Sequence, residues 1–310
     1  MIYENFKNTK TDRTVKALIG MSREKFDLLV PHFSSAYREI QEEQRQNKEI
    51  MRLPAGGKKG VFSSHEERLF FVLFYLKTYP TFDVLGFHFG LSAGHAHDYI
   101  KFFTRVLNRA LSNLEMLPAQ EIESPEDMRQ LFDKTDDIII DGVESRCVRP
   151  KNEEEQKACY SGKKKCHTVK SLVISDRQRK LLFVSPLFDG SVHDYAMMNS
   201  LFDPALPWFD NLTVRLDLGF LGAEKDYSAS SSIFLPHKKP RKSKKNPCHE
   251  LTSEQKQTNR RLAKTRIIVE HAIGGMKHFF CLTHRIRNRS VSLINQFFSL
   301  AAGLWNMKIV

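Results

Sequence analysis

The sequence has no run of 18 or more apolar residues, which argues against a membrane-spanning helix. Its first residues lack the charged and then apolar pattern of a secretory signal, so we expect no export. The five cysteines form no CxxC pair, and their odd number favours reduced thiols in a cytosol-like compartment. Cys147, Cys159, Cys166 and His167 match no common zinc-finger spacing, so we expect no structural zinc site. No internal repeat is visible.

Acidic residues are scarce towards the end of the chain. From Lys238 to Val310 there are sixteen Lys or Arg residues but only three acidic ones, and the whole chain has a net charge of +12 and a pI near 9.4. This balance favours a polyanionic partner. Glu270 is the last acidic side chain of this basic region. It could be no more than a surface salt-bridge partner, but its position on a predicted helix favours a functional role.

Three carboxylates lie on separate predicted elements. Asp141 directly follows three isoleucines that we interpret as the end of a buried strand, and Gly142 lets a bulky partner approach the backbone there. Asp217 follows a second predicted strand in the same way, and Glu270 lies in a helical stretch at 266–273. Three such carboxylates can converge on divalent cations, which need oxygen ligands and open positions for phosphate and water.

The length of 310 residues predicts two domains, joined where a polar segment with two prolines begins near Leu117. The expected organisation is a helical segment and linker at 1–60, a helix-turn-helix domain at 61–116, a linker at 117–134 and an α/β domain at 135–310.

The segment 81–111 has the pattern of a helix-turn-helix. A short helix should run from Thr81 to about His88, followed by a turn at Gly90 and a longer helix that Ser92 caps. The start of the second helix carries polar and basic side chains suited to bases and phosphates. These are Ser92, His95, Lys101 and Arg105. The alternative is an ordinary three-helix packing module without DNA contact.

The second half of the chain predicts a mixed five-stranded sheet with flanking helices. Strands at 167–174 and 180–184 should form an antiparallel meander with the strand that ends at Asp141. A helix from Gly190 then crosses over, so the strand before Asp217 should lie parallel to the first. A fifth strand is expected at 231–235.

This order of elements resembles the RNase H-like fold of DDE transposases and integrases. Five blocks resemble the successive signatures of bacterial insertion-sequence transposases and the related Harbinger-type nucleases: Ile140-Asp141-Gly142, Tyr160-Ser161-Gly162-Lys163-Lys164, Gly190-Ser191-Val192-His193-Asp194, Leu216-Asp217-Leu218-Gly219-Phe220 and Arg266-Ile267-Ile268-Val269-Glu270. The resemblance spans about 60–300. The fourth block often reads Asp-Lys-Gly-Tyr or Asp-Ser-Gly-Tyr in that group, and the difference here leaves the carboxylate in place.

The resemblance implies that Asp141, Asp217 and Glu270 are the metal ligands of a transposase that cuts and joins element ends. It also implies Mg²⁺, with Mn²⁺ as a substitute. Two such ions about 3.5–4 Å apart would activate water or a 3′-hydroxyl and stabilise the leaving oxygen. The partners would be double-stranded DNA of the element ends and the target, bound by a homodimer or larger assembly. The expected location is the bacterial cytoplasm at the nucleoid, or the nucleus of a eukaryotic host.

Other polar residues are expected to support the site or to contact DNA. Asp194 rivals the triad, but a carboxylate at a helix start is also favoured by capping and the helix dipole, so we expect Asp194 and His193 to support the site without binding metal. The segment 238–245 resembles a nuclear localisation signal, although a loop that contacts the DNA backbone fits its internal position better. Expected DNA contacts beyond the helix-turn-helix are Lys163, Lys164, Lys165, Lys238, Lys239, Arg241, Lys242, Arg266 and Lys277. For the lysines at 163–165, a solvated loop is the alternative.

Two rival functions are open at this point. One is a related DNA endonuclease that cleaves without strand transfer, and the other is a DNA-binding regulator that has lost catalysis. The intact Asp, Asp and Glu set weighs against the second. The apolar helix expected at 291–307 should pack on the sheet or on a second copy of the chain, and the alternative is that one protomer buries both of its sides.

Overall fold

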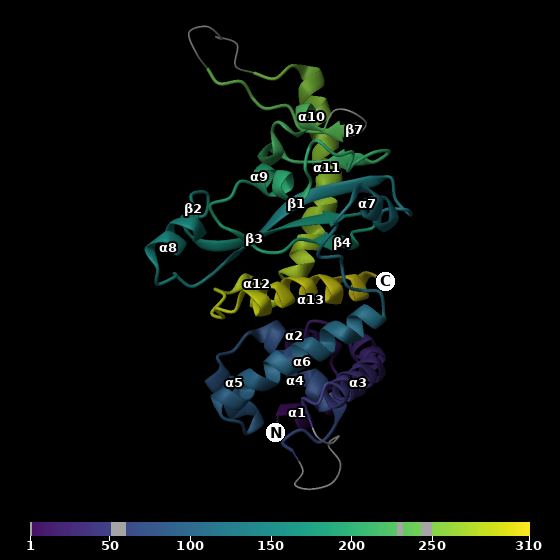
Figure 1. Ribbon diagram of the computed structural model, residues 1–310, viewed down its shortest axis with the longest axis vertical. Coiled ribbons are helices and arrows are strands. Elements are labelled where there is room, and N and C mark those ends of the chain that lie inside the picture. The colour runs from purple at the N-terminus through teal and green to yellow at the C-terminus, as the bar shows by residue number, and fades with distance from the viewer. Residues whose placement is uncertain (1, 51–59, 228–231, 243–249) are drawn as a thin grey trace. The chain divides into compact units, whose positions relative to one another are not determined.

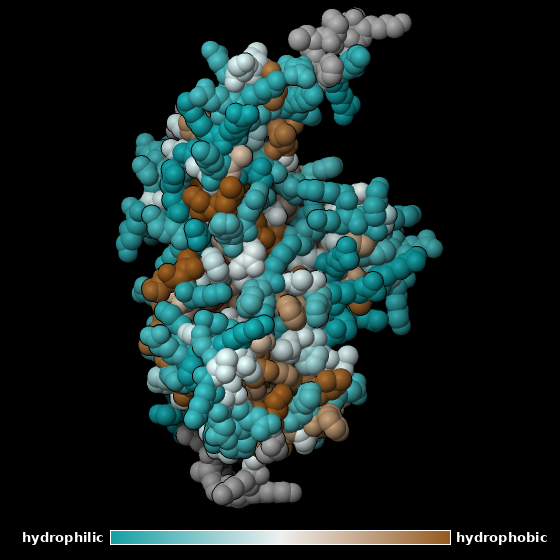
Figure 2. Space-filling view, turned by 180° about the vertical axis from the view of Figure 1, so that it is seen from behind, coloured by the Kyte–Doolittle hydropathy of each residue, from teal (hydrophilic) through white to brown (hydrophobic). Residues whose placement is uncertain are grey.

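The computed structural model describes residues 2–50, 60–227, 232–242 and 250–310 (Figure 1). The chain forms two compact units. The helical unit comprises Met1–Leu117 and Gly275–Val310, and the sheet unit comprises Pro118–Gly274. Among the helices in the described ranges, none is long and apolar enough to cross a membrane. The face of the molecule in Figure 2 is mostly hydrophilic, with apolar residues in scattered groups.

The helical unit is built around α4. Its elements are α1 Ile2–Lys7, α2 Asp12–Ile19, α3 Arg23–Gln46, α4 His65–Thr78, α5 Phe82–Phe89, α6 Ala93–Asn113, α12 Phe280–Thr283 and α13 Val291–Ile309. Helix α4 is buried on nearly every side from Leu69 to Lys77, because α2, α3, α6 and α12 all pack against it. A helix that is apolar all round belongs at such a centre.

The predicted helix-turn-helix is confirmed as α5, a turn and α6. Thr81 caps α5 and Ser92 caps α6, each by accepting a hydrogen bond from a backbone N–H in the first turn. Gly90 ends α5 with φ +67°, a conformation that favours glycine. A Cβ on Gly86 would lie 2.4 Å from the carbonyl oxygen of Leu91, so the turn folds tightly back on α5.

The C-terminal helix α13 packs on α6 and α12 of its own helical unit. This packing fits the alternative that the helix is buried within one protomer. Asn306 Nδ2 donates a hydrogen bond to the Met116 carbonyl at 2.9 Å, and a Cβ on Gly303 would lie 2.8 Å from the Leu117 side chain. Nearly all of α13 from Leu293 to Met307 is buried. The apolar composition of α13 predicts that the helix is buried, but it does not predict which element covers it.

The sheet unit contains the chain's α/β part. Its strands are β1 Asp137–Arg146, β2 Tyr160–Ser161, β3 Cys166–Ser175, β4 Leu181–Val184, β5 Phe188–Asp189, β6 Thr213–Arg215 and β7 Ser232–Phe234. Its helices are α7 Pro125–Leu131, α8 Glu153–Cys159, α9 Asp194–Leu201, a 3-10 turn at Leu218–Phe220, α10 Ala223–Asp226 and α11 Ser253–Met276, the last of which ends in the helical unit.

The main strands form the predicted mixed five-stranded sheet, in the order β4-β3-β1-β6-β7. The first three are antiparallel, with Asp141 opposite Val173, whereas β6 is parallel to β1 and β7 is parallel to β6. The two-residue strands β2 and β5 also pair with β3. This arrangement is consistent with an RNase H-like fold. The residue at which the fifth strand was expected to begin, Ser231, lies outside the described residues.

Part of the expected linker at 117–134 is built into the sheet unit. Ala119 forms a bridge with Phe183 of β4, donating to Leu182 O and accepting from Val184 N at 2.9 Å each. The predicted helix start at Ser124 is confirmed by a capping box with Asp127. The sequence pattern correctly indicated a polar segment with prolines. It did not predict that this segment pairs with the edge strand β4.

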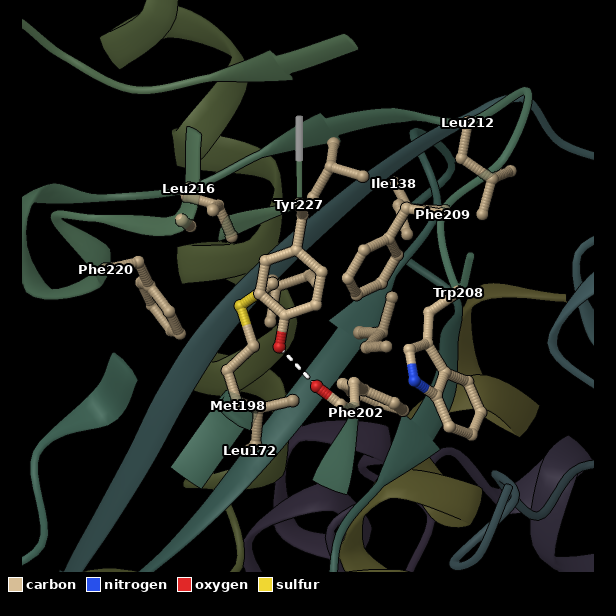
Figure 3. Packing of buried hydrophobic residues seen from close by; sticks show 14 of the residues in the cluster. Ile138, Leu172, Met198, Phe202, Trp208, Phe209, Leu212, Leu216, Phe220 and Tyr227 are labelled. Carbon is tan, nitrogen blue, oxygen red and sulfur yellow. Dashed lines mark hydrogen bonds between the residues drawn. The ribbon is translucent and has the colours of Figure 1, made fainter. Parts of the chain in front are cut away.

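The core of the sheet unit fixes the strands that carry the carboxylates (Figure 3). Ile138 of β1 and Leu172 of β3 are fully buried there, beside the side chain of Phe202, which follows α9. The Tyr227 hydroxyl donates a hydrogen bond to the Phe202 carbonyl, and Trp208 Nε1 donates to Asp203 O at 3.0 Å. This core holds α9 against the sheet, and α9 begins at Asp194.

Candidate active site

Asp141 lies in the middle of β1, which continues to Arg146, so the expectation that the strand ends at this residue was wrong. Its Oδ1 accepts a hydrogen bond from its neighbour's backbone, Gly142 N, at 2.7 Å. A Cβ on Gly142 would lie 3.2 Å from Asp194 Oδ1, so this glycine marks the place where α9 begins against β1. The predicted close approach at Gly142 is therefore present, and its partner is a third aspartate.

Asp217 follows β6 and caps the short 3-10 turn. Its Oδ1 accepts a hydrogen bond from Gly219 N at 2.6 Å. A Cβ on Gly219 would lie 2.8 Å from Asp217 Oδ1 and 2.9 Å from Asp194 Oδ2. The carboxylate of Asp194 thus lies close to Gly142, inside β1, and to Gly219, just after β6, so α9 begins beside both of these parallel strands.

Lys170 of β3 neutralises Asp194 and was not anticipated from the sequence. Its ammonium Nζ lies 3.2 Å from Asp194 Oδ1 and donates to Val192 O at 2.7 Å, with the side chain only 12% exposed. A lysine in the middle of an apolar strand was the available signal, because a buried cation needs a partner. The contact ties the segment before α9 to the sheet.

Arg266 and Glu270 lie one turn apart on α11. Arg266 Nη2 is 3.2 Å from Glu270 Oε1 and 3.8 Å from Asp217 Oδ2. The side chain of Glu270 is 53% exposed, whereas those of Arg266 and Asp217 are 25% and 23% exposed. Arg266 therefore bridges the predicted second and third carboxylates, and Glu270 is held by this arginine rather than by packing.

Negative charge is concentrated around Asp141. Burial, followed by the carboxylate of Asp217, raises the pKa of Asp141 to about 6. The N–H of Gly142 and the charge of Arg266 act in the opposite direction, and Asp194 adds to the rise. Two carboxylates that repel each other in a partly buried site create a local potential that favours a cation.

A divalent cation fits this site by its donor chemistry. Carboxylate oxygens are the ligands that Mg²⁺ and Mn²⁺ prefer, and no thiolate or imidazole competes among the three predicted ligands. In the part of the chain that the structure describes, however, no three His, Cys, Asp or Glu side chains are already arranged to hold a metal ion. Arg266 occupies the contact between Asp217 and Glu270 instead.

The lysine turn at 163–165 lies far along β3 from the carboxylates. All three side chains are exposed, and Lys165 N donates to Ser161 O at 2.8 Å to close the turn. Lys165 precedes Val173, the register partner of Asp141, by eight residues. At about 3.3 Å per residue this is ~26 Å, so these lysines and the carboxylates would meet different phosphates.

The other predicted contacts fall into three groups. On α6, Ser92 uses its hydroxyl as the helix cap, while His95, Lys101 and Arg105 are exposed. After β7 the basic side chains Lys238, Lys239, Arg241 and Lys242 are exposed, and residues 243–245 lie outside the described residues. Lys277 belongs to the helical unit, and His193 is exposed at the N-cap of α9 without a capping hydrogen bond.

The four described cysteines, including Cys147, Cys159 and Cys166 of the segment considered for zinc, are free thiols. Cys159 Sγ donates to Asp189 Oδ1 at 3.3 Å. The fifth cysteine, Cys248, lies outside the described residues.

A mixed sheet with one aspartate inside β1 and another just after β6, a later helix that carries a glutamate, and a helix-turn-helix point to a DDE-type nuclease. Residues 140–306 match the family described as DDE superfamily endonuclease, and residues 64–113 match the helix-turn-helix of DDE superfamily endonuclease. The first match covers 167 of the 310 residues, so the chain belongs to the DDE superfamily endonucleases. This membership implies nuclease activity, and the helix-turn-helix indicates DNA binding. Enzymes of this family generally use divalent metals.

Among named proteins, the chain is similar to the probable transposase for insertion sequence element IS702 of Microchaete diplosiphon. The two sequences are 25% identical over 300 residues, which cover 96% of this chain and 95% of that protein. No solved structure matches the chain.

Proposed function

We propose that this protein is a transposase that cleaves DNA at the ends of a mobile element and joins those ends to target DNA. The observation that carries the proposal is the meeting of β1 and β6 around Asp194, with Glu270 of α11 linked to Asp217 through Arg266. Similarity along nearly the full length of a probable transposase supports it. The protein would act at chromosomal DNA, in the nucleoid or the nucleus, as a homodimer or larger assembly that holds two element ends together.

Asp141, Asp217 and Glu270 are the proposed metal ligands. Two Mg²⁺ ions, or Mn²⁺ in their place, would supply the activation of the attacking water or 3′-hydroxyl and the stabilisation of the leaving oxygen. The backbone N–H groups of Gly142 and Gly219 donate hydrogen bonds to Asp141 and Asp217, and each bond fixes one oxygen of the carboxylate. Arg266 is exposed enough to leave Glu270 for a DNA phosphate, because a guanidinium binds phosphate as well as carboxylate.

Lys170 is proposed to position the site without touching DNA or metal. It forms an ion pair with Asp194. The Asp194 carboxylate in turn lies close to Gly142 and Gly219, the glycines next to the proposed ligands. His193 and Asp194 thus remain supporting residues in this proposal.

The direct test uses purified full-length protein and a DNA fragment that carries the genomic sequences flanking this reading frame. We expect strand cleavage at the element ends and joining to a target plasmid, both dependent on Mg²⁺ or Mn²⁺ and abolished by EDTA. Cleavage without joined products would favour the endonuclease alternative. Specific binding without any cleavage would favour the regulator.

The helix-turn-helix prediction is best tested by point variants. A chain that starts near residue 125 would remove α4 and α6, on which α12 and α13 pack, and would expose their apolar faces. Instead, Lys101→Gln combined with Arg105→Gln should flatten the dependence of log K on log salt by up to about 1.8, at ~0.9 per phosphate contact. The control is Lys10→Gln combined with Arg13→Gln, which removes two exposed cations near α2. An unchanged slope for the α6 variant would rule out α6 as the DNA-contacting helix.

The exposed basic residues after β7 should add affinity without sequence preference. Changing Lys238, Lys239, Arg241 and Lys242 to glutamine should weaken binding to element ends and to random duplex by similar factors. The salt slope should fall by as much as about 3.6, four contacts at ~0.9 each. Anisotropy titrations of both DNAs across a salt series measure this. A loss confined to the element ends would show instead that the segment reads sequence.

A further inference from the structure

The helical unit contains a basic segment that comes from the other end of the sequence. Residues 284–290, between α12 and α13, include Arg285, Arg287 and Arg289, and no acidic residue occurs from 271 to the end of the chain. The segment belongs to the same compact unit as the helix-turn-helix, from which it is separated by the whole sheet unit in sequence.

Arg287 fastens this segment to the start of the helix-turn-helix. Its guanidinium Nη2 donates to Tyr79 O at 2.7 Å and to Pro80 O at 2.8 Å, and it lies over the Tyr79 ring at 4.3 Å. Its backbone N–H donates to the Tyr79 hydroxyl at 3.0 Å. Asn288 adds hydrogen bonds to the hydroxyls of Tyr75 and Tyr79. The segment is therefore fixed at the point where α4 ends, two residues before the Thr81 cap of α5.

The first turn of α13 continues along α6. His97 and Lys101 of α6 line a cavity of about 130 Å³ together with Ser290, the N-cap of α13, and Gln296. Lys101 also lines a second cavity of about 270 Å³, with Arg105 and Gln296. Arg289 directly precedes Ser290, so its backbone joins the cavity that His97 and Lys101 of α6 line.

Two arginines of the segment are available to a partner. Arg285 and Arg289 are exposed, and neither forms an ion pair within the described residues, whereas Arg287 is used to anchor the backbone. When a recognition helix enters the major groove, about 12 Å wide, phosphates of the duplex flank it on both sides. Cations fixed beside such a helix are placed to contact those phosphates.

We propose that the segment 284–290 and α6 form one DNA-binding surface, in which Arg285 and Arg289 bind phosphates of the duplex that α6 contacts. The proposal rests on the helix-turn-helix function proposed above and extends it to the far end of the chain. A DNA-binding module limited to residues 64–113 would lack these contacts and the anchor that positions them.

The test uses the full-length protein and a random-sequence duplex, with binding measured by anisotropy between about 50 and 200 mM salt. Arg285→Gln combined with Arg289→Gln should flatten the slope of log K against log salt by about 1.8. The factor by which K falls between 50 and 200 mM salt should then be roughly tenfold smaller than in the wild type. Lysine at both positions should restore the slope. The Lys10→Gln and Arg13→Gln control should keep it unchanged, and thermal unfolding should show that all variants are folded.

Comparison with the α6 variant separates this proposal from the one on which it rests. If Lys101→Gln with Arg105→Gln flattens the slope but the 285 and 289 variant does not, the shared surface is refuted while the helix-turn-helix stands. If neither variant changes the slope of a protein that still binds, both fall. If only the 285 and 289 variant acts, the segment binds DNA apart from α6, which also contradicts a shared surface. The single Arg289→Gln variant gives the same comparison if the double variant is unstable.

Discussion

Alanine at Asp141, Asp217 or Glu270 should lower Mg²⁺-dependent cleavage of element-end DNA by at least about 10³-fold, or ~4 kcal/mol of barrier. The expected loss follows from removing a metal ligand, whereas DNA affinity in EDTA should change little, because binding rests on basic residues elsewhere. Single-turnover cleavage and anisotropy on the same preparations measure both quantities. Glu121→Ala, at an exposed carboxylate of the sheet unit, is the control.

The third ligand is the decisive point in that experiment. Glu270 is exposed and paired with Arg266, while Asp194 lies against Gly142 and Gly219. If Glu270→Ala cleaved at nearly the normal rate and Asp194→Asn did not, Asp194 would replace Glu270 as the ligand. Loss of activity in Asp194→Asn alone would not decide this, because Lys170 would then be left buried without its partner.

Asp141→Asn should stabilise the metal-free protein at neutral pH while it destroys activity. The folded-state pKa of Asp141 is raised from 3.8 to about 6, so the folded state binds the extra proton between these values. Stability therefore falls as pH rises through about 4 to 6 and stays lower above that window. Asparagine removes this penalty, which amounts to roughly 1–3 kcal/mol for a shift of about two units.

Urea unfolding in EDTA at several pH values measures the difference between wild type and Asp141→Asn. It should be small near pH 4 and largest above pH 6, and equal pH dependence of the two proteins would contradict the expectation. Asp137, on the same strand, provides a control of opposite sign. Burial acts to raise its pKa, but Arg215 and Arg177 outweigh burial and hold the pKa below its usual range. Its contribution is present above that range and lost in acid, so Asp137→Asn should destabilise the neutral protein.

Local signals in the sequence were enough to predict the parts of the fold that depend on local physics. The caps at Thr81 and Ser92 and the glycine between them specify the helix-turn-helix without reference to the rest of the chain. The isoleucines before Asp141 and the alternation at 167–174 likewise specify strands, and short connections left few ways to order them.

Contacts between distant segments were not predictable in the same way. Lys170 and Asp194 are 24 residues apart, and no periodicity in either segment indicates the other. The bridge of Arg266 between Asp217 and Glu270 depends on how α11 lies on the sheet unit. An apolar helix such as α13 can be covered by any apolar surface of suitable shape, so its place on α6 required the structure.

The helical unit is assembled from both ends of the chain, and this has a consequence during protein synthesis. The ribosome releases α6 long before α13 exists, so the helical unit cannot complete its core until α13 has been synthesised. A copy stopped by a nonsense mutation between Glu270 and Val291 would still encode all three carboxylates and the whole helix-turn-helix. Its α6 would nevertheless expose the apolar side chains that α13 covers, and such a surface invites aggregation and proteolysis. A gene decaying from its 3′ end would therefore lose DNA binding together with cleavage, and its product would not persist as a competitor for the element ends.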